Sequence, residues 1–270
     1  MLIYLSYGYK KSLTGWSEAF YFIYVSHNIQ AMKKRTHILF LILTILFSAE
    51  VHAQHSAGMT GLFNIPTAEN KEAGTVYIGG NFLPKEMLPP YFTNSYNSGN
   101  YFLTADLFSF LEISYRMTLI RDENKKFNQQ DRAFSLRVQA LREKKYVPGV
   151  AIGFYDPMVD EGVSAYENYY IVTTKGFNLK GSLLSATVGY YIPIHSHRNE
   201  ALKLNNKGVF AGVSFSPAFY RDMQIGVEYD TKRFNVGATV KVLNCLKAHV
   251  FTQEFKNISA GLRYECELWH

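Results

Sequence analysis

Residues 223–242 carry an alternation that constrains the fold more than any other feature of the chain. In 223–229 and again in 234–242, apolar side chains at every second position alternate with polar residues or glycine. A period of two places the two sets on opposite faces of a β-strand. Because only residues 230–233 separate the two runs, they predict an antiparallel β-hairpin with one apolar and one polar face.

The same period recurs along most of the chain after residue 73, and no amphipathic helix interrupts it. Consecutive strands with short links are typical of an up-and-down antiparallel meander. We therefore predict an all-β fold of about twelve strands, near residues 74–83, 101–106, 111–119, 132–141, 147–155, 168–177, 183–192, 207–215, 223–229, 234–242, 246–252 and 258–268.

Glycines on the polar face indicate that this meander closes on itself. On the exposed face of an open sheet glycine only weakens a strand, whereas on the concave face of a barrel it relieves crowding and permits bending. The polar phase of several predicted strands contains such a residue, namely Gly189, Gly212, Gly226, Gly237 and Gly261. We predict a closed antiparallel β-barrel.

The apolar face of this barrel is expected to meet lipid. Apolar-out, polar-in alternation over about ten residues is the signature of a transmembrane β-barrel. The chain has 20 Tyr and 20 Phe, and several of them lie in pairs at predicted strand ends, where aromatic girdles form at membrane surfaces. We predict an up-and-down transmembrane β-barrel in the outer membrane, with outer-membrane lipid as a partner. A secreted carbohydrate-binding β-sandwich would show the same alternation and is the alternative.

Residues 32–53 contain the parts of a secretory signal peptide in the required order. A basic stretch follows Met32, residues 38–47 are apolar, and Ala53 offers a small residue for cleavage. The apolar run is shorter than the roughly 20 residues of a membrane-spanning helix. We expect residues 1–31 to be a gene-model extension, 32–53 a signal peptide, 54–73 an N-terminal coil segment and 74–270 the barrel. A membrane-active leader is the alternative, because residues 20–25 are also apolar.

The charge pattern argues against nucleic-acid binding. The formal net charge is +6, but residues 1–53 hold five of the 28 basic and two of the 22 acidic residues, which leaves +3 for the remainder. The basic residues there lie singly among carboxylates and form no stripe of the kind that binds phosphates. We therefore expect no nucleic acid among the partners.

The two cysteines are expected to remain unbonded. Two are too few for a disulfide scaffold. The alternation places Cys245 on the inward phase and Cys266 on the outward phase. Opposite faces of a sheet do not bring Cβ atoms within the roughly 4.5 Å that a disulfide requires.

Charged residues on the polar face of the last strands form the main candidate site. Glu228 and Asp230 share that face on one strand, and Lys241 lies on the same face of the next. Arg263 and Glu265 on the last strand are expected to join them, since a closed barrel pairs its last strand with its first. These residues are predicted to line a charged constriction that selects or gates solutes, or to form an interior salt-bridge network.

The sequence gives little support to catalytic or metal chemistry. Its scattered carboxylates do not make the pair that glycoside hydrolysis needs, and His249 with Ser259 lacks a glycine-x-serine-x-glycine elbow. His195 and His197 have no third ligand at a metal-binding spacing, so an exposed loop is the simpler interpretation. We predict a non-enzymatic protein without a cofactor. Aromatic residues on the polar face are expected to stack on sugar rings or to fill the interior, namely Tyr155, Tyr191 and Phe210.

Three stretches carry motifs that occur in the same order in a known family. They are residues 61–68 with 74–76, residues 150–156 with 167–177, and residues 228–230 with 235–237. The positions that match are Gly61, Pro66, Thr67, Gly153, Asp156, Lys175, Asn235 and Gly237. In these stretches the chain resembles the YjbH-type outer-membrane proteins linked to exopolysaccharide and capsule production. It is shorter than many members and has no acylatable cysteine after the predicted cleavage site.

The resemblance implies a non-enzymatic barrel that supports the biosynthesis or export of exopolysaccharide or capsule. It also implies the polymer and export-system proteins as partners. From the residues alone, a general small porin or a structural outer-membrane protein remains the alternative.

Overall fold

The computed structural model describes residues 55–88, 97–120, 129–156, 167–194 and 206–268. The predicted leader, residues 1–53, lies outside these ranges. The described residues form one short 3-10 helix, η1 (Lys85–Met87), and the strands β1 (Thr75–Leu83), β2 (Ser98–Phe108), β3 (Leu111–Ile120), β4 (Gln129–Leu141), β5 (Gly149–Tyr155), β6 (Asn168–Leu179), β7 (Ser182–Pro193), β8 (Gly208–Ser216), β9 (Met223–Tyr229), β10 (Phe234–Leu243), β11 (Leu246–Gln253) and β12 (Asn257–Glu267). Within these ranges, no helix is both long enough and apolar enough to cross a membrane.

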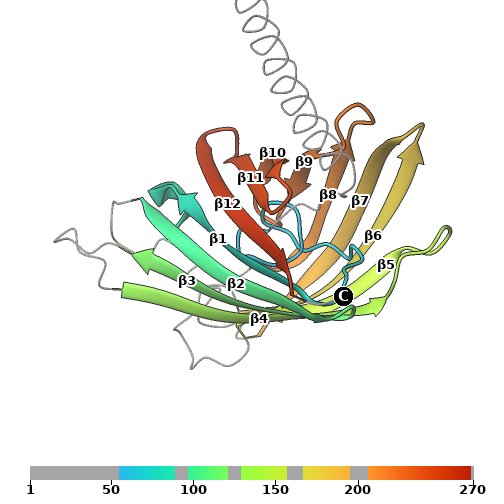
Figure 1. Cartoon of the computed structure of the whole chain (residues 1–270). Coiled ribbons are helices and arrows are strands. Elements are labelled where there is room, and N and C mark those ends of the chain that lie inside the picture. The colour runs from blue at the N-terminus through green and yellow to red at the C-terminus, as the bar shows by residue number, and fades with distance from the viewer. Residues whose placement is uncertain (1–54, 89–96, 121–128, 157–166, 195–205, 269–270) are drawn as a thin grey trace, which may run out of the picture. The chain divides into compact units, whose positions relative to one another are not determined.

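All the strands belong to one closed antiparallel barrel (Figure 1). Each strand pairs with its neighbours in sequence, and β12 closes the sheet by pairing with β1 from Thr75↔Glu267 to Phe82↔Ala260. The predicted up-and-down barrel is confirmed, and a single closed sheet excludes the β-sandwich. The hairpin of residues 223–242 is β9 with β10, with Gly226 opposite Gly237.

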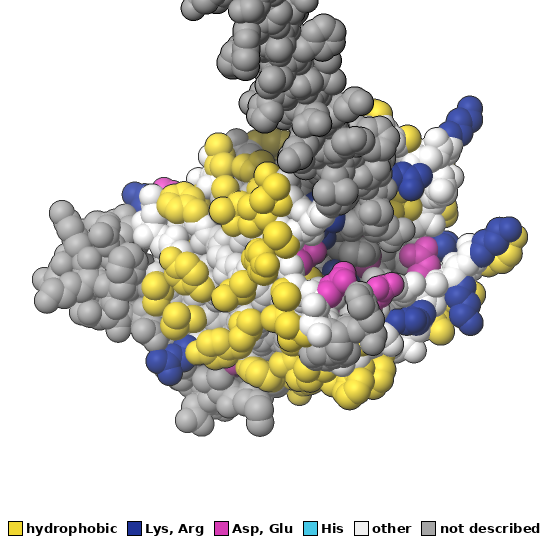
Figure 2. Space-filling view, viewed as in Figure 1, with side chains coloured by type: hydrophobic (Ala, Val, Ile, Leu, Met, Phe, Trp, Pro, Cys, Tyr) yellow, Lys and Arg dark blue, Asp and Glu magenta, His cyan; other side chains and the backbone are white. Residues whose placement is uncertain are grey.

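The alternation sorts side chains to the two sides of the wall as predicted. In β9, Ile225 and Val227 are 44% and 47% exposed, whereas Gln224 and Glu228 are 4% and 1% exposed. Apolar side chains therefore point outward and polar ones point into the lumen. In Figure 2, apolar side chains spread over the outer faces of the strands, while acidic ones gather toward the hollow of the barrel. This is the distribution expected of a barrel in lipid.

The lumen is occupied by the chain's own N-terminal residues. Residues 55–68, which we call the lumen segment, coil within the space that the strands enclose (Figure 1). Met59 and Ile65 are completely buried there, and an isolated bridge between Gly61 and Pro66 folds the segment back on itself. The sequence predicted a coil in this region. The structure adds that the coil fills the interior.

Inward-facing glycines make room for the segment and for aromatic rings. A Cβ atom on Gly212 would lie 2.6 Å from Leu62 Cδ1 and 2.8 Å from Ile65 Cδ1, well inside the normal separation of carbon atoms. Three further glycines each lie against the aromatic ring of their directly paired residue, in the pairs Gly79–Phe102, Gly153–Tyr170 and Gly189–Phe210. Gly237 lies against the Cβ and backbone of its paired residue, Phe251. Relief of crowding, predicted for the polar-face glycines, is confirmed.

The two ends of the barrel differ in the length of their connections. At the short-turn end, strands are joined by tight turns such as residues 244–245. At the long-loop end, the connections are longer, such as 84–97 and 194–207. The lumen segment begins near the long-loop end, where the Ser56 carbonyl accepts a hydrogen bond from Asn100. It leads to β1, which starts at the short-turn end.

Candidate functional site: the occupied lumen and its mouth

A buried carboxylate on β9 fixes the tip of the lumen segment. Glu228 Oε2 accepts a hydrogen bond from the backbone N–H of Phe63 at 2.9 Å, and Oε1 accepts one from that of Asn64 at 2.6 Å. The amide of Asn235, opposite Glu228 in β10, donates at 2.8 Å to Oε1. Glu228 therefore holds the segment and is not an open lumen charge.

A second anchor lies six strands away around the barrel, on β3 and β4. Glu112 Oε1 accepts a hydrogen bond from the backbone N–H of Thr60 at 2.7 Å. Its Oε2 pairs with Arg137 Nη1 at 3.4 Å, and both side chains are buried. Arg137 Nε in turn donates to the Thr67 carbonyl at 3.1 Å. The segment is thus held from opposite walls.

Apolar and aromatic contacts fill the space between these anchors. Phe63 stacks on Phe251 of β11 with ring centroids 5.4 Å apart. Leu62 and Ile65 join a buried cluster that continues into the wall through Tyr155, Tyr170, Tyr191 and Phe210. The aromatic residues predicted on the polar face therefore fill the interior. Tyr155 and Tyr191 also border a cavity described below.

His55 starts the segment and is held as a neutral ring. Its Nε2 lies 2.7 Å from the Asn64 carbonyl, and its Nδ1 accepts a hydrogen bond from the N–H of Ala57 at 2.9 Å. These partners assign the proton to Nε2. Burial lowers the pKa of His55 from 6.5 to about 4; the bond to Asn64 opposes this shift and the nearby Arg116 adds to it.

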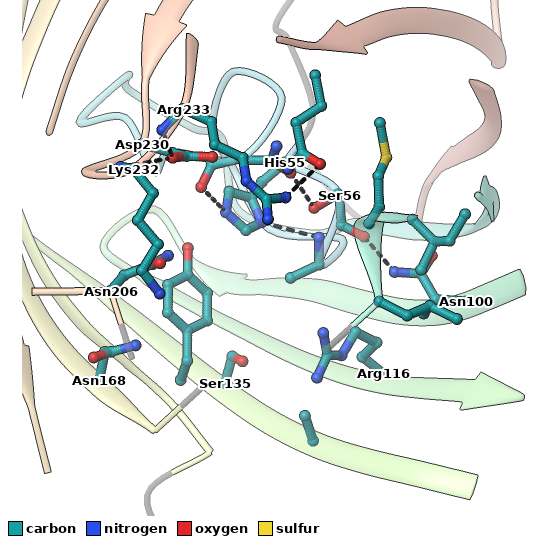
Figure 3. Close-up of a pocket in the computed structure, with 18 of the residues that line it drawn as sticks. His55, Ser56, Asn100, Arg116, Ser135, Asn168, Asn206, Asp230, Lys232 and Arg233 are labelled. Atoms are coloured by element: carbon teal, nitrogen blue, oxygen red, sulfur yellow. Dashed lines mark hydrogen bonds between the residues drawn. The ribbon is translucent and has the colours of Figure 1, made fainter. Parts of the chain in front are cut away.

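A cavity of about 170 Å³ lies at the long-loop end, between the lumen segment and the wall. We call it the mouth cavity. Figure 3 shows His55 and Ser56 on one side of it and Arg116 and Asn168 on the other. Its polar and aromatic lining comprises amides (Asn64, Asn100, Asn168, Asn206, Gln253), hydroxyls (Ser56, Ser135), aromatic rings (His55, Tyr155, Tyr191, Phe251), cations (Arg116, Lys232, Arg233) and one carboxylate (Asp230).

The turn between β9 and β10 supplies most of the charge in this cavity. Asp230 Oδ1 accepts hydrogen bonds from the backbone N–H groups of Lys232 at 3.1 Å and Arg233 at 2.9 Å. Its Oδ2 accepts one from Asn235 at 3.1 Å. Both carboxylate oxygens of Asp230 therefore accept hydrogen bonds from groups of its own hairpin. Desolvation lowers the pKa of Lys232, Asp230 partly offsets this, and the like charge of Arg233 lowers it further.

The other predicted lumen charges lie at the opposite end of the wall. Lys241 is six residues beyond Asn235 on β10, which separates it from Glu228 by about 20 Å at 3.3 Å per residue. Lys241 is therefore not the partner of Glu228, and the expected single network is wrong. Lys241, Lys247 and Arg263 instead occupy paired positions on β10, β11 and β12. Glu265 pairs with Arg263, and with Lys247 at 3.0 Å.

Half of the residues that carry the family resemblance act on the lumen segment. Gly61 and Pro66 form its bridge, the Thr67 carbonyl binds Arg137, and Asn235 supports Glu228. The remaining four are placed in the wall or its connections. Gly153 lies against the ring of Tyr170, and Gly237 lies against the Cβ and backbone of Phe251. Asp156 is buried directly after β5 with a positive φ of 51°, and Lys175 pairs with Glu143.

The structure does not bring together the residues considered as candidates for catalysis or metal binding. The Ser259 hydroxyl donates to the Phe82 carbonyl at 2.7 Å, whereas the His249 ring packs 6.2 Å from that of Phe251. Within the described ranges, no group of three or more His, Cys, Asp or Glu side chains is placed to hold a metal ion. His195 and His197 lie outside those ranges.

The cysteines are free, which confirms the prediction that they are not bonded to each other. Part of the reasoning was wrong, because Cys245 lies in the turn between β10 and β11 and not at an inward strand position. A turn residue has no fixed place in the alternation, so its side-chain direction does not follow from the period of the neighbouring strands.

Glu112, Arg137 and His55 were not singled out from the sequence. Glu112 and Arg137 do lie on the polar phase of their strands, but the early strands offered no cluster of charge to draw attention. A stronger signal was Leu62-Phe63 with Ile65 in a coil. In a barrel whose apolar face meets lipid, such residues can be buried only in the lumen.

Comparisons with known proteins give a family match and several similar solved structures. The family model described as exopolysaccharide biosynthesis protein YbjH matches residues 53–270. No curated protein sequence matches the chain. Among solved structures, the chain is similar to the KdgM porin (12% identity, 70% of this chain and 98% of that chain, TM-score 0.42). It is also similar to Omp33 of Acinetobacter baumannii (6%, 74% and 100%, 0.40) and to outer membrane phospholipase A from Escherichia coli (10%, 74% and 99%, 0.39).

Proposed function

The chain belongs to the YjbH family of exopolysaccharide biosynthesis proteins, and we propose that it is a non-enzymatic outer-membrane barrel supporting the biosynthesis or export of exopolysaccharide or capsule. The barrel wall with its apolar outer face supports the membrane location. The family supports the link to polysaccharide.

The occupied lumen is the observation that favours this role over that of a general porin. A general porin keeps a water-filled channel. Here the lumen segment fills the interior and is bonded to Glu228 and Glu112 on opposite walls. The proposed protein is therefore closed in this form. It acts as a gated passage, or as a docking or assembly site for polymer and export-system proteins.

The two unequal ends suggest an orientation for this role. Outer-membrane barrels have short periplasmic turns and longer extracellular loops. In the proposed orientation, the long-loop end and its mouth cavity face the cell exterior. The short-turn end, with Lys241, Lys247 and Arg263, faces the periplasm.

Gene deletion with quantification of surface and released polysaccharide tests the proposal. We expect the deletion to reduce polymer, the full chain to restore it, and uptake of small solutes to be unchanged. Unchanged polymer together with reduced solute uptake would instead identify a general porin.

A further inference from the structure

Three neighbouring turns at the short-turn end form one surface, which we call the basic rim. They join β4 to β5 (residues 142–148), β6 to β7 (180–181) and β8 to β9 (217–222), and they are neighbours because β5 pairs with β6 and β7 with β8. We propose that the basic rim binds the phosphate headgroup of an anionic phospholipid in the adjacent leaflet. The inference rests on the membrane barrel and its apolar wall, and it goes beyond the proposed link to polysaccharide.

Hydrogen bonds and an ion pair hold the three turns in place relative to one another. Glu143 in the β4–β5 turn pairs with Lys175 of β6 and accepts a hydrogen bond from the N–H of Gly176 at 2.8 Å. Arg221 Nε in the β8–β9 turn donates to the Gly181 carbonyl at 3.2 Å. Because β6 and β7 form one hairpin, these bonds link all three turns. The basic side chains therefore lie on a preformed surface.

The basic rim has a net positive charge, and it lies on one side of the barrel only. The three turns together with residues 175–179 hold six basic and two acidic residues, a formal charge of +4. The stretch 69–72, which contacts the β4–β5 turn through Asn70, lowers this sum to +3. The other two short turns, 109–110 and 244–245, contain no charged residue. The basic residues of the rim are Arg142, Lys144, Lys145, Lys175, Lys180 and Arg221, and the acidic ones are Glu143 and Asp222.

This uneven distribution favours an anion at one place on the barrel's end. A general preference for headgroups would spread basic residues over all the short turns. Figure 2 shows basic side chains at the tips of the β4–β5 and β6–β7 hairpins, at the right of the view. Positive charge beside a membrane attracts anionic lipid.

The tips of the basic rim combine exposed cations with exposed aromatic rings. Lys145 and Tyr146 form the end of the β4–β5 turn, because Lys144 and Val147 on either side exchange backbone hydrogen bonds of 2.9 and 3.3 Å. Tyr146 is 84% exposed, and the Lys145 ammonium lies 5.2 Å from the centre of its ring. Phe219 in the β8–β9 turn is 86% exposed. Aromatic rings gather at the level of lipid headgroups, which is where the proposed phosphate would lie.

The apolar outer face of the wall continues up to these cations. Phe177 and Leu179 on β6 and Phe215 on β8 are exposed on the outer side, and Lys175 Nζ lies 5.9 Å from the centre of the Phe177 ring. A phospholipid matches both parts, because its acyl chains pack on the apolar face while its phosphate meets the cations. Guanidinium groups can share two hydrogen bonds with a phosphate, and ammonium groups attract it as point charges. An acidic soluble protein would match the charge but not the adjoining apolar face.

Two phospholipids with the same acyl chains test the inference on the purified full-length protein. Dioleoyl phosphatidylglycerol carries one negative charge, whereas dioleoyl phosphatidylcholine has no net charge. The protein in detergent is titrated with each lipid, and bound lipid is counted by native mass spectrometry. We expect the anionic lipid to bind at least about tenfold more tightly, the effect of one to two cations near an anionic headgroup. The preference should shrink as salt is raised.

Matched lysine variants locate the site. Lys145→Gln with Lys180→Gln is expected to reduce the preference for phosphatidylglycerol at least about fivefold. Lys85→Gln with Lys256→Gln removes two exposed lysines at the long-loop end and is expected to retain the preference. Heat-dependent gel migration shows in each case that the barrel has folded.

Three results would each overturn the inference. They are equal affinity of the native protein for the two lipids, an unchanged preference in Lys145→Gln with Lys180→Gln, and an equal loss of preference in both double variants. A rim that binds an acidic protein instead of lipid would give the first of them. None of these results bears on the polysaccharide role, which gene deletion tests separately.

Discussion

Both carboxylate oxygens of Glu228 are bonded to the lumen segment, so this residue offers the most direct test of the closed lumen. In Glu228→Ala, the N–H groups of Phe63 and Asn64 lose their acceptors, at a cost of about 1–3 kcal/mol each. We expect a looser segment, seen as higher single-channel conductance in planar bilayers. Glu228→Gln keeps one acceptor oxygen and should have a smaller effect.

The matched control for this substitution is Glu86→Ala. Glu86 lies in η1 at the long-loop end, and nearly half of its side chain is exposed. Glu86→Ala also deletes one carboxyl group, without touching the lumen segment. Identical conductance in Glu228→Ala and Glu86→Ala would contradict the anchoring role.

His55 should make closure of the lumen depend on pH. Its pKa is about 4 when buried and 6.5 ordinarily, so a released segment takes up a proton at higher pH than a docked one. Docking is therefore at full strength above about pH 6.5 and weakens as the pH falls toward 4, by up to about 3 kcal/mol. We expect conductance to rise between pH 7.5 and 4.5 in the native protein.

The variant His55→Gln separates this effect from general acid sensitivity. Glutamine can offer one acceptor and one donor but cannot gain a proton in this range. Its conductance should change much less between the two pH values. A rise as large as that of the native protein would show that other groups titrate.

Single residues also show which features could not be predicted from the sequence pattern. The period of two correctly placed Glu228 and Lys241 on the inner face, whereas Asp230, which was expected on the same strand as Glu228, lies in the turn after β9. The period does not give position along the strand, which depends on register. The tight turn after Tyr229 contained that information, because it puts Lys241 beside Asp222, to whose carbonyl its N–H donates. The expected partnership with Glu228 could have been rejected from the hairpin alone.

At the scale of elements, the lumen segment is held by burial as well as by hydrogen bonds. Leu62 and Ile65 are almost completely buried, and each truncation of such a side chain to alanine costs about 2–5 kcal/mol. We expect the double variant Leu62→Ala with Ile65→Ala to open the lumen, with larger conductance and faster proteolysis of residues 55–68.

Lipid-facing residues of the same types provide the control. Leu262 and Ile258 on β12 are more than half exposed on the outer face. Their double alanine variant removes the same atoms but should leave conductance at the native level. Similar conductance in the two double variants would mean that the segment does not seal the barrel.

There is a physical reason why the sequence predicts the strands more completely than the lumen segment. A strand in the wall has lipid on one side and the lumen on the other, so it must alternate, and β9 and β10 were found almost to the residue. The lumen segment contacts different walls through backbone groups at Thr60, Phe63 and Asn64. Backbone contacts impose no side-chain period, so its ordered coil was predicted but its place was not.

At the scale of the whole molecule, closure leaves the barrel without a free strand edge. β1 is hydrogen-bonded to both β2 and β12 along its length, and such closed sheets resist detergent until heated. We expect unboiled and boiled samples in SDS to migrate differently, and extraction from cells to require detergent. The Leu62→Ala, Ile65→Ala variant should behave likewise, because the wall hydrogen bonds do not involve the segment. Recovery as a soluble periplasmic protein would contradict the membrane barrel.

The position of the lumen segment imposes an order of assembly. The segment comes before every strand, yet it bonds to Glu112, Thr174 and Glu228, which lie 52, 106 and 165 residues away from their partners in the chain. Contacts between such distant residues form late, since the intervening chain must first give up its freedom. A wall that closed early would have to admit the segment through one of its mouths. A segment gathered before β12 meets β1 would instead serve as a template around which the strands are wound.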